Sequence, residues 1–166
     1  MVGDDDSTTI RWLNDVVGDM AKHSDNGHCK RGLGSKLYEL KKSRPSCQQL
    51  SATVIAYIQK MFSYVLQGNA NDPAALRSTL LAIVPHAFGD HTKCNAKWCG
   101  YLQRGAASYK HAGLPHGKNL TCPATKSALD GIFSGLAEQA DKLAPLGSSQ
   151  VSEAFNNTVT SKAPKA

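Results

Sequence analysis

Apolar residues that recur three or four positions apart constrain this chain more than any other feature. The clearest series consists of Leu50, Val54, Ile58, Met61, Phe62 and Val65. Residues at this spacing share one face of an α-helix, so the series predicts an amphipathic helix that ends near Gly68. The apolar–polar alternation that is typical of strands is nearly absent. We therefore expect a mainly α-helical chain.

Further signals predict more helices. A helix over about residues 8–20 follows from the series Ile10, Leu13, Val17 and Met20. Asp72 followed by Pro73 is typical of a helix N-terminus and predicts a helix through Val84, which Pro85 is expected to end. Another helix should begin around Pro123, on the series Leu129, Ile132, Phe133, Leu136 and Leu143. A last short helix is expected over about residues 150–160.

The length and the charge limit the classes of protein that fit. A chain of 166 residues can bury the core of one domain. Its longest apolar runs fall well short of the roughly 18 residues that span a bilayer. The acidic N-terminus lacks the pattern of a signal peptide, so secretion is not expected. The net charge of +6 suits a polyanionic partner.

The positive charge is concentrated in a basic segment, residues 27–44. It contains a single acid, Glu39, against the basic residues Lys30, Arg31, Lys36, Lys41, Lys42 and Arg44. Such a cluster is typical of a nucleic-acid contact, and an ordinary solvated helix face is the alternative. The basic segment therefore indicates a polyanionic partner, most often nucleic acid.

The segment between Pro85 and Cys122, called the Cys/His segment below, has a different composition. It has no apolar series, and four of the six histidines of the chain lie in it. A stretch without an apolar face needs another source of order, such as a bound metal. The five cysteines of the chain are odd in number, which argues against a disulfide framework. Structural zinc is the prediction.

The candidate zinc ligands are His91, Cys94, Cys99 and His111, with His86 and His116 as alternatives. The set Cys94, Cys99, His111 and His116 approaches the spacing of a two-Cys, two-His finger, although Gly113 and Pro115 disfavour the finger helix. A second set, His86, His91, Cys94 and Cys99, would form a compact knuckle. The sequence does not choose between these two ligand sets. Two alternatives to a zinc site are buried thiols without a metal and, less favoured, a catalytic Cys–His pair.

The stretch GDDDSTT near the start of the chain allows two interpretations. Acidic and hydroxyl residues favour the first turn of a helix, where free backbone N–H groups need acceptors. Carboxylates are also the ligands that Mg²⁺ and Mn²⁺ prefer. The residues themselves favour the helix start.

Four segments taken in order resemble the Mutator-like transposase domain of invertebrate mobile elements. They are GDDDSTT (3–9), GHCKRGLGSKLYELKK (27–42), the Cys/His segment and SQVSEAFNNTVTSKAPK (149–165). In that family a GD-x-DS motif precedes GH-x-x-[KR]-x-LG-x-x-L-x-x-LKK, a helical Cys/His insertion and [NS]-E-[SA]-x-N. The resemblance covers nearly the whole chain.

This resemblance implies an RNase H-like fold whose DDE carboxylates bind two Mg²⁺ or Mn²⁺ ions. Asp4 or Asp6 would be the second catalytic acid and Glu153 the third. The DNA backbone would be contacted by Lys30, Arg31, Lys36, Lys41 and Lys42. The first acid of the family lies on an earlier strand, so the chain corresponds to the C-terminal portion of the core. We expect residues 1–20 and 146–166 to be core remnants and residues 21–145 a helical, zinc-bearing insertion.

Such a fragment is expected to act on DNA in the nucleus and not to cut DNA unaided. A homo-oligomer in a transposition complex is the oligomeric state that the resemblance suggests. The alternative function is a non-enzymatic, zinc-stabilised module that binds DNA or a protein. A plain helical domain without a site is the third hypothesis. Loss of helical structure on chelation would separate the second hypothesis from the third.

Overall fold

The computed structural model describes residues 26–145, and within this range it contains helices and no strand. The helices are α2 (Asn26–Ser43), α3 (Ala52–Gly68), α4 (Pro73–Ala87), α5 (Gly100–Arg104), the 3₁₀ helix η1 (Pro115–Gly117), α6 (Pro123–Glu138) and α7 (Ala140–Leu143). The mainly α-helical prediction is confirmed. The helices expected over residues 8–20 and 150–160 lie outside the described residues.

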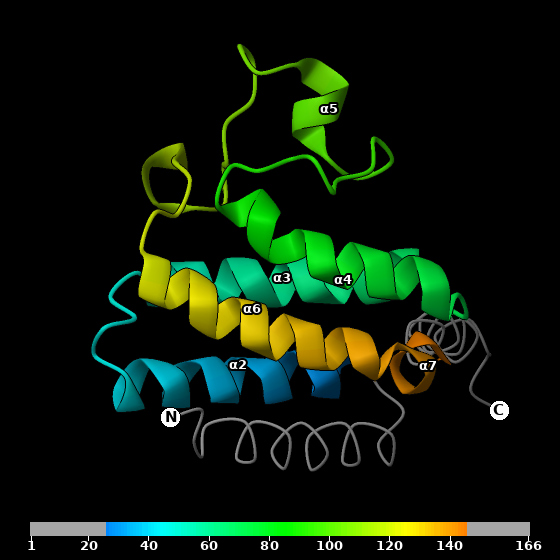
Figure 1. Ribbon diagram of the computed structural model, residues 1–166, viewed down its shortest axis with the longest axis horizontal. Coiled ribbons are helices and arrows are strands. Elements are labelled where there is room, and N and C mark those ends of the chain that lie inside the picture. Colours follow the sequence, from blue (N-terminus) through cyan, green and yellow to red (C-terminus); the bar gives the residue numbers. More distant parts are fainter. Residues whose placement is uncertain (1–25, 146–166) are drawn as a thin grey trace, which may run out of the picture.

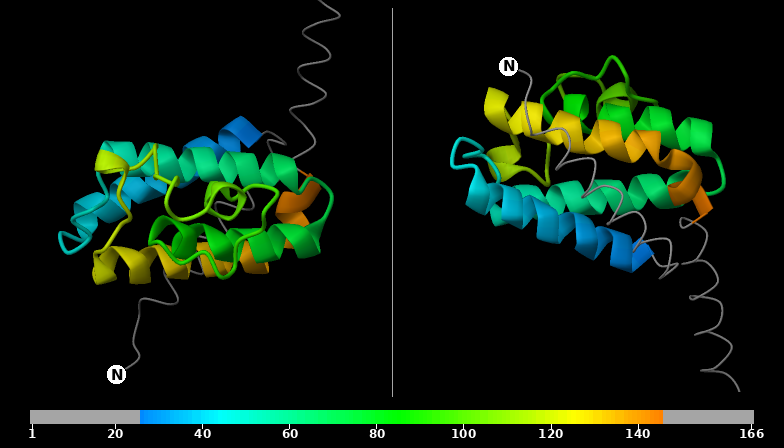
Figure 2. Two further views of the ribbon diagram at one scale, coloured as in Figure 1. Left: turned by 90° about the horizontal axis from the view of Figure 1, so that it is seen from above. Right: turned by 60° about the horizontal axis from the view of Figure 1, so that its bottom comes forward.

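The long helices form a bundle with the Cys/His segment on one side of it. Helix α4 packs most extensively against α6, and α2 packs against α3. Figure 1 shows α2 on one side of the bundle and the loops around α5 on the other. Seen from above, these loops lie across α3 and α4 (Figure 2). The basic segment and the Cys/His segment therefore occupy opposite sides of the molecule.

The predicted starts of α4 and α6 and the predicted end of α3 near Gly68 agree with the structure. Ser51 caps α3 by accepting the backbone N–H of Val54 at 3.2 Å. The carboxylate of Asp72 caps α4 by accepting the N–H of Ala75 at 3.0 Å. Helix α6 begins at Pro123. Each of the two caps satisfies a backbone donor that has no partner within its helix, and the predicted starts of α4 and α6 both have a proline in the first turn.

The expected end of α4 at Pro85 is wrong, because the helix continues to Ala87. A proline lacks one N–H and crowds the preceding turn, but in the last turn this removes a single hydrogen bond. The chain then closes locally: the N–H of Phe88 donates to the carbonyl of Val84 at 3.2 Å, and that of Asp90 donates to Pro85 at 2.9 Å. The extension places His86 inside the helix.

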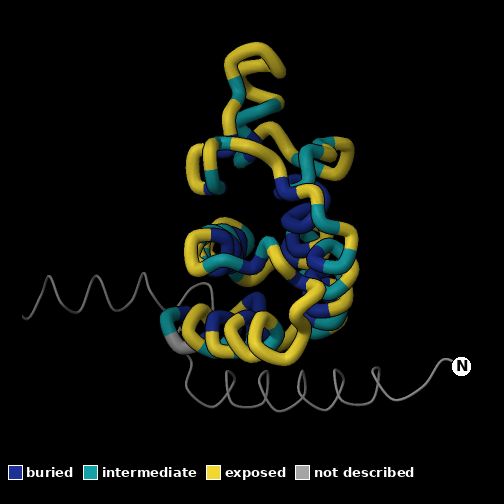
Figure 3. The backbone as a smooth tube through the Cα atoms, turned by 90° about the vertical axis from the view of Figure 1, so that its left-hand side faces the viewer, coloured by how far each residue is buried: buried dark blue, intermediate teal, exposed yellow. Residues whose placement is uncertain are grey.

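The core is built from the buried faces of α2, α3, α4 and α6. The rings of Phe62 and Phe133 meet edge to face at its centre, with centroids 6.4 Å apart. Leu33 and Leu37 of α2 are buried one turn apart against α3. Figure 3 shows buried residues concentrated between the helices, with the Cys/His segment largely exposed. Among the described residues, no helix is both long and apolar enough to cross a membrane.

Candidate metal centre

Four donor side chains from the first half of the Cys/His segment converge on one point. This metal cluster consists of His86, His91, Cys94 and Cys99, and its four ligand atoms lie within 4.8 Å of one another. His86 comes from the last turn of α4, and Cys99 immediately precedes α5. The other two ligands lie on the connecting loop, where the N–H of Cys94 donates to the carbonyl of His91 at 3.1 Å.

Short hydrogen bonds within the loop hold the cluster in shape. The Asp90 carboxylate accepts both the N–H and the hydroxyl of Thr92, at 3.0 and 2.6 Å. Three residues later in the loop, the Asn95 carbonyl accepts the N–H of Cys99 at 3.0 Å. Gly89 turns the chain out of α4 with a φ of 85°, a conformation that favours glycine. These contacts define the path that the loop takes around the cluster.

Five of the six separations between ligand atoms of the cluster match those of a tetrahedral zinc site. Bonds of about 2.3 Å to sulfur and about 2.0 to 2.1 Å to nitrogen place ligand atoms about 3.4 Å apart for two nitrogens and about 3.6 Å apart for nitrogen and sulfur. The two Nδ1 atoms of His86 and His91 are 3.1 Å apart. Cys94 Sγ lies 3.4 and 3.8 Å from these nitrogens, and Cys99 Sγ lies 3.7 and 3.5 Å from them.

The protonation states suit the same chemistry. Burial, together with His111 and His91, lowers the pKa of His86 to about 3, so its imidazole is neutral at physiological pH. Burial also lowers the pKa of His91. Burial and the neighbouring Cys99 raise the pKa of Cys94 to about 12, so its thiol loses its proton only when a cation takes its place. Two thiolates would neutralise a Zn²⁺ ion.

Aromatic side chains enclose the cluster. The ring of Tyr101 stacks on His91 with centroids 4.0 Å apart, and the ring of Trp98 lies 5.1 Å from that of His86. The Tyr109 hydroxyl lies 3.0 Å from Nε2 of His86. This contact lets His86 donate from Nε2, which leaves its Nδ1 lone pair for a metal. The sequence analysis missed these aromatic residues, although their density within the Cys/His segment was a usable signal.

The two remaining histidine candidates have different positions. His111 is only 3% exposed and lies next to the cluster, with its ring 4.9 Å from that of His86. Its Nδ1 lies 3.2 Å from the Tyr109 hydroxyl, while its Nε2 has no partner among the described residues. His116 is exposed on η1. The structure thus brings together the knuckle set, places His111 beside it and leaves His116 apart.

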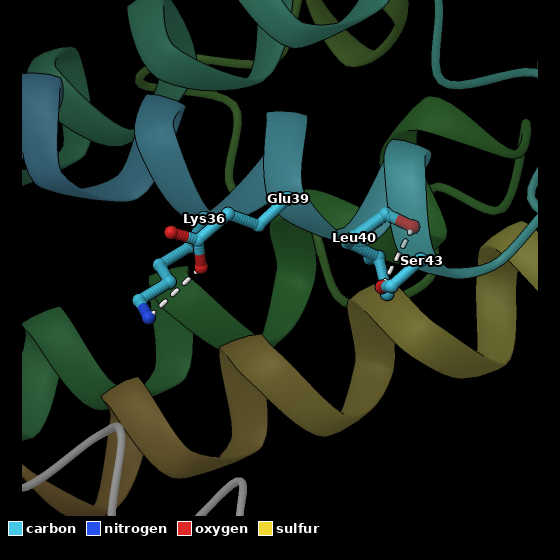
Figure 4. A network of polar contacts seen from close by, with 4 residues as sticks. All are labelled: Lys36, Glu39, Leu40 and Ser43. Carbon is cyan, nitrogen blue, oxygen red and sulfur yellow. Dashed lines mark hydrogen bonds and ion pairs between the residues drawn. The ribbon is translucent and has the colours of Figure 1, made fainter.

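The basic segment forms most of α2, and its charges are largely exposed. Lys30, Arg31, Lys41 and Lys42 are exposed, and we call them the basic face. Lys36 is partly buried and forms an ion pair with Glu39, with 3.0 Å between Nζ and Oε2. Figure 4 shows this pair on the surface of α2, with the Ser43 hydroxyl donating to the Leu40 carbonyl in the next turn.

The predicted catalytic acids Asp4, Asp6 and Glu153 lie outside the described residues. No curated protein and no solved structure matches the chain. The family of Mutator-like transposases matches it over residues 1–99, a range that ends at the last residue of the metal cluster. This match covers more than half of the sequence, so the chain belongs to the Mutator-like transposase family.

Proposed function

We propose that residues 26–145 are the zinc-stabilised, DNA-binding helical module of a Mutator-like transposase. The observation that carries the zinc assignment is the agreement of five ligand separations with tetrahedral zinc geometry, each within about 0.3 Å. Four protein ligands close the coordination sphere, which is the arrangement of structural rather than catalytic zinc. The ion would tie the end of α4 to the start of α5 across a loop that lacks an apolar face.

Zinc binding is tested by metal analysis of the purified chain. We expect one zinc per chain, and loss of that zinc with a lower melting temperature in Cys94→Ser. Cys122→Ser is the matched control, because Cys122 is a partly exposed cysteine outside the cluster. A chain that purifies without zinc and is indifferent to added Zn²⁺ would overturn the assignment.

DNA binding is proposed to use the basic face of α2. Lys30 and Lys41 are eleven residues apart, as are Arg31 and Lys42, which is about three helical turns and about 16 Å. The members of each pair therefore lie on the same side of the helix, and the two pairs form two rows of charge about 100° apart around its axis that can contact phosphates of a duplex. Such contacts tolerate any sequence. Lys36 has an intramolecular partner in Glu39 and would contribute less.

Duplex binding measured against salt concentration tests this proposal. The variant Lys41→Gln/Lys42→Gln should bind a DNA duplex more weakly, and its slope of log K against log salt should fall by about two. Lys118→Gln/Lys142→Gln removes the same charge from exposed positions elsewhere and should bind like the wild type. Equal slopes for all three proteins would exclude the basic face as the DNA contact.

The catalytic role belongs to the complete transposase core. We infer that Asp4 or Asp6 and Glu153 are ligands of Mg²⁺ or Mn²⁺ there, in residues 1–20 and 146–166. Bound by these carboxylates, two such ions would supply activation of the attacking oxygen and stabilisation of the leaving oxygen of a phosphodiester. A longer protein with additional upstream sequence should show metal-dependent nuclease activity that Glu153→Gln abolishes. If no such protein cuts DNA, the non-enzymatic, zinc-stabilised binding module becomes the better description.

A further inference from the structure

A groove lies beside the metal cluster, on the opposite side of the bundle from the basic face. It has a volume of about 780 Å³ and is bounded by residues 64–70 at the end of α3, residues 72–79 of α4 and residues 93–98 of the loop. Figures 1 and 2 show this loop crossing over α3 and α4. Neither the sequence analysis nor the family match points to this surface.

The charges that border the groove favour an anionic ligand. Lys93 and Lys97 are exposed on the loop, and neither forms an ion pair with a described residue. The only carboxylate that lines the groove within the described residues is Asp72, and its Oδ1 already accepts the N–H of Ala75 at the start of α4. Two ammonium groups and one carboxylate therefore border the groove, and Asp90, which interacts electrostatically with Lys93, also accepts hydrogen bonds from Thr92.

The groove also offers aromatic surfaces. Tyr64 is 59% exposed, an unusual position for a large ring on an otherwise well-packed helix. Trp98 lines the groove from the loop and is partly exposed. Lysines next to accessible aromatic rings are the combination that binds unpaired nucleic-acid strands, since the lysines hold phosphates while bases stack on the rings.

We propose that this groove binds a single strand of DNA, with phosphates at Lys93 and Lys97 and bases stacked on Tyr64 and Trp98. The choice of DNA rests on the proposed function, whereas the site itself is separate from the basic face. Base pairs in a duplex are stacked and closed, so the aromatic rings select an unpaired strand. An enzyme that transfers DNA ends needs such a strand held near its scaffold.

The groove and the metal cluster share residues, which couples the two sites. Cys94 belongs to the cluster and also lines the groove. Trp98 lines the groove, and the centroid of its ring lies 5.1 Å from that of His86. Both lysines are within three residues of a cluster cysteine in the sequence. Removal of zinc should therefore disorder the loop that carries these side chains. The chain without zinc should then no longer bind single-stranded DNA.

The test uses the full chain loaded with zinc and a fluorescein-labelled oligothymidylate, followed by anisotropy. Tyr64→Ala should weaken binding about five- to 150-fold, the range for loss of one stacked base. Lys93→Gln/Lys97→Gln should weaken it and reduce the salt slope by about 1.4. Zinc content and melting temperature should stay at wild-type values, since Tyr64, Lys93 and Lys97 are exposed. The controls are Lys118→Gln/Lys142→Gln and Tyr38→Ala, which remove comparable exposed groups outside the groove.

The outcomes separate this proposal from the proposed function. If both groove variants bind the oligothymidylate with wild-type affinity, the groove is not the single-strand site. The proposed function would still hold in that case if Lys41→Gln/Lys42→Gln weakens duplex binding. Duplex binding as tight as single-strand binding through the same groove residues would overturn the stacking model. Absence of any DNA binding by the zinc-loaded wild type would refute the function itself.

Discussion

The Tyr109 hydroxyl allows a sharp test of the metal centre, because it contacts two histidines and is not a ligand itself. It lies 3.0 Å from Nε2 of His86 and 3.2 Å from Nδ1 of His111. With His86 donating from Nε2, the hydroxyl accepts that proton and donates its own to His111. This chain of two hydrogen bonds keeps the Nδ1 of His86 unprotonated and directed at the other ligands.

Tyr109→Phe removes the oxygen and keeps the ring. The N–H of His86, whose residue is 3% exposed, would then be buried without an acceptor, at a cost of about 1 to 3 kcal/mol. At about 1.4 kcal/mol per tenfold change, this corresponds to a five- to 150-fold loss of zinc affinity. Replacement of residues that orient metal ligands in other proteins costs about 10- to 100-fold.

The assay is competition for Zn²⁺ against a chelator of known affinity, together with the absorption spectrum of the Co²⁺-substituted chain. Tyr101→Phe is the matched control, since the ring that stacks on His91 at 4.0 Å is retained. We expect weaker metal binding in Tyr109→Phe alone, with a Co²⁺ spectrum still typical of two sulfur and two nitrogen ligands. Equal zinc affinities for Tyr109→Phe and the wild type would refute the role assigned to this hydroxyl.

Three further predictions concern the scaffold. Gly89→Ala should lower both the melting temperature and the zinc affinity, because φ is 85° there and an added Cβ would overlap the side-chain amide of Asn119; thermal melts and chelator competition would show it. Phe133→Ala should destabilise the chain by about 3 to 5 kcal/mol in urea unfolding, since it empties the centre of the core next to Phe62. Ser51→Ala should cost about 1 kcal/mol in the same experiment through loss of the cap on α3, with no change in zinc content.

Helices with a continuous apolar face were predictable from the sequence. The series from Leu50 to Val65 and the Asp72–Pro73 start gave α3 and the beginning of α4 because burial and capping act locally. For the residues of α2, a helix was predicted only in the alternative interpretation of the basic segment, as a solvated helix face. Its buried positions Cys29, Leu33 and Leu37 are four residues apart, so the spacing of a helix face was present within the basic segment.

A zinc site in the Cys/His segment was predictable from the sequence, but the identity of its four ligands was not. Cysteine and histidine density indicated zinc, yet sequence spacing alone could not choose between His86 and His111, because it does not fix the path of a loop. The choice of His86 depends on α4 continuing past Pro85, which carries this imidazole to the start of the loop. The position of the catalytic acids remains a prediction from the resemblance.

The location of the cluster explains why a helical module would need a metal. Helices α2, α3, α4 and α6 bury their apolar faces against one another, so they have their own source of stability. Between Phe88 and Tyr109, the only fully buried residue is Cys99, so this stretch gains little from apolar burial. A closed zinc site can supply the missing free energy, because its ligands are brought together only in the folded chain. Chelation should therefore release the loop and the groove lysines while the bundle keeps most of its helical circular dichroism; simultaneous loss of both would mean that the metal supports the whole fold.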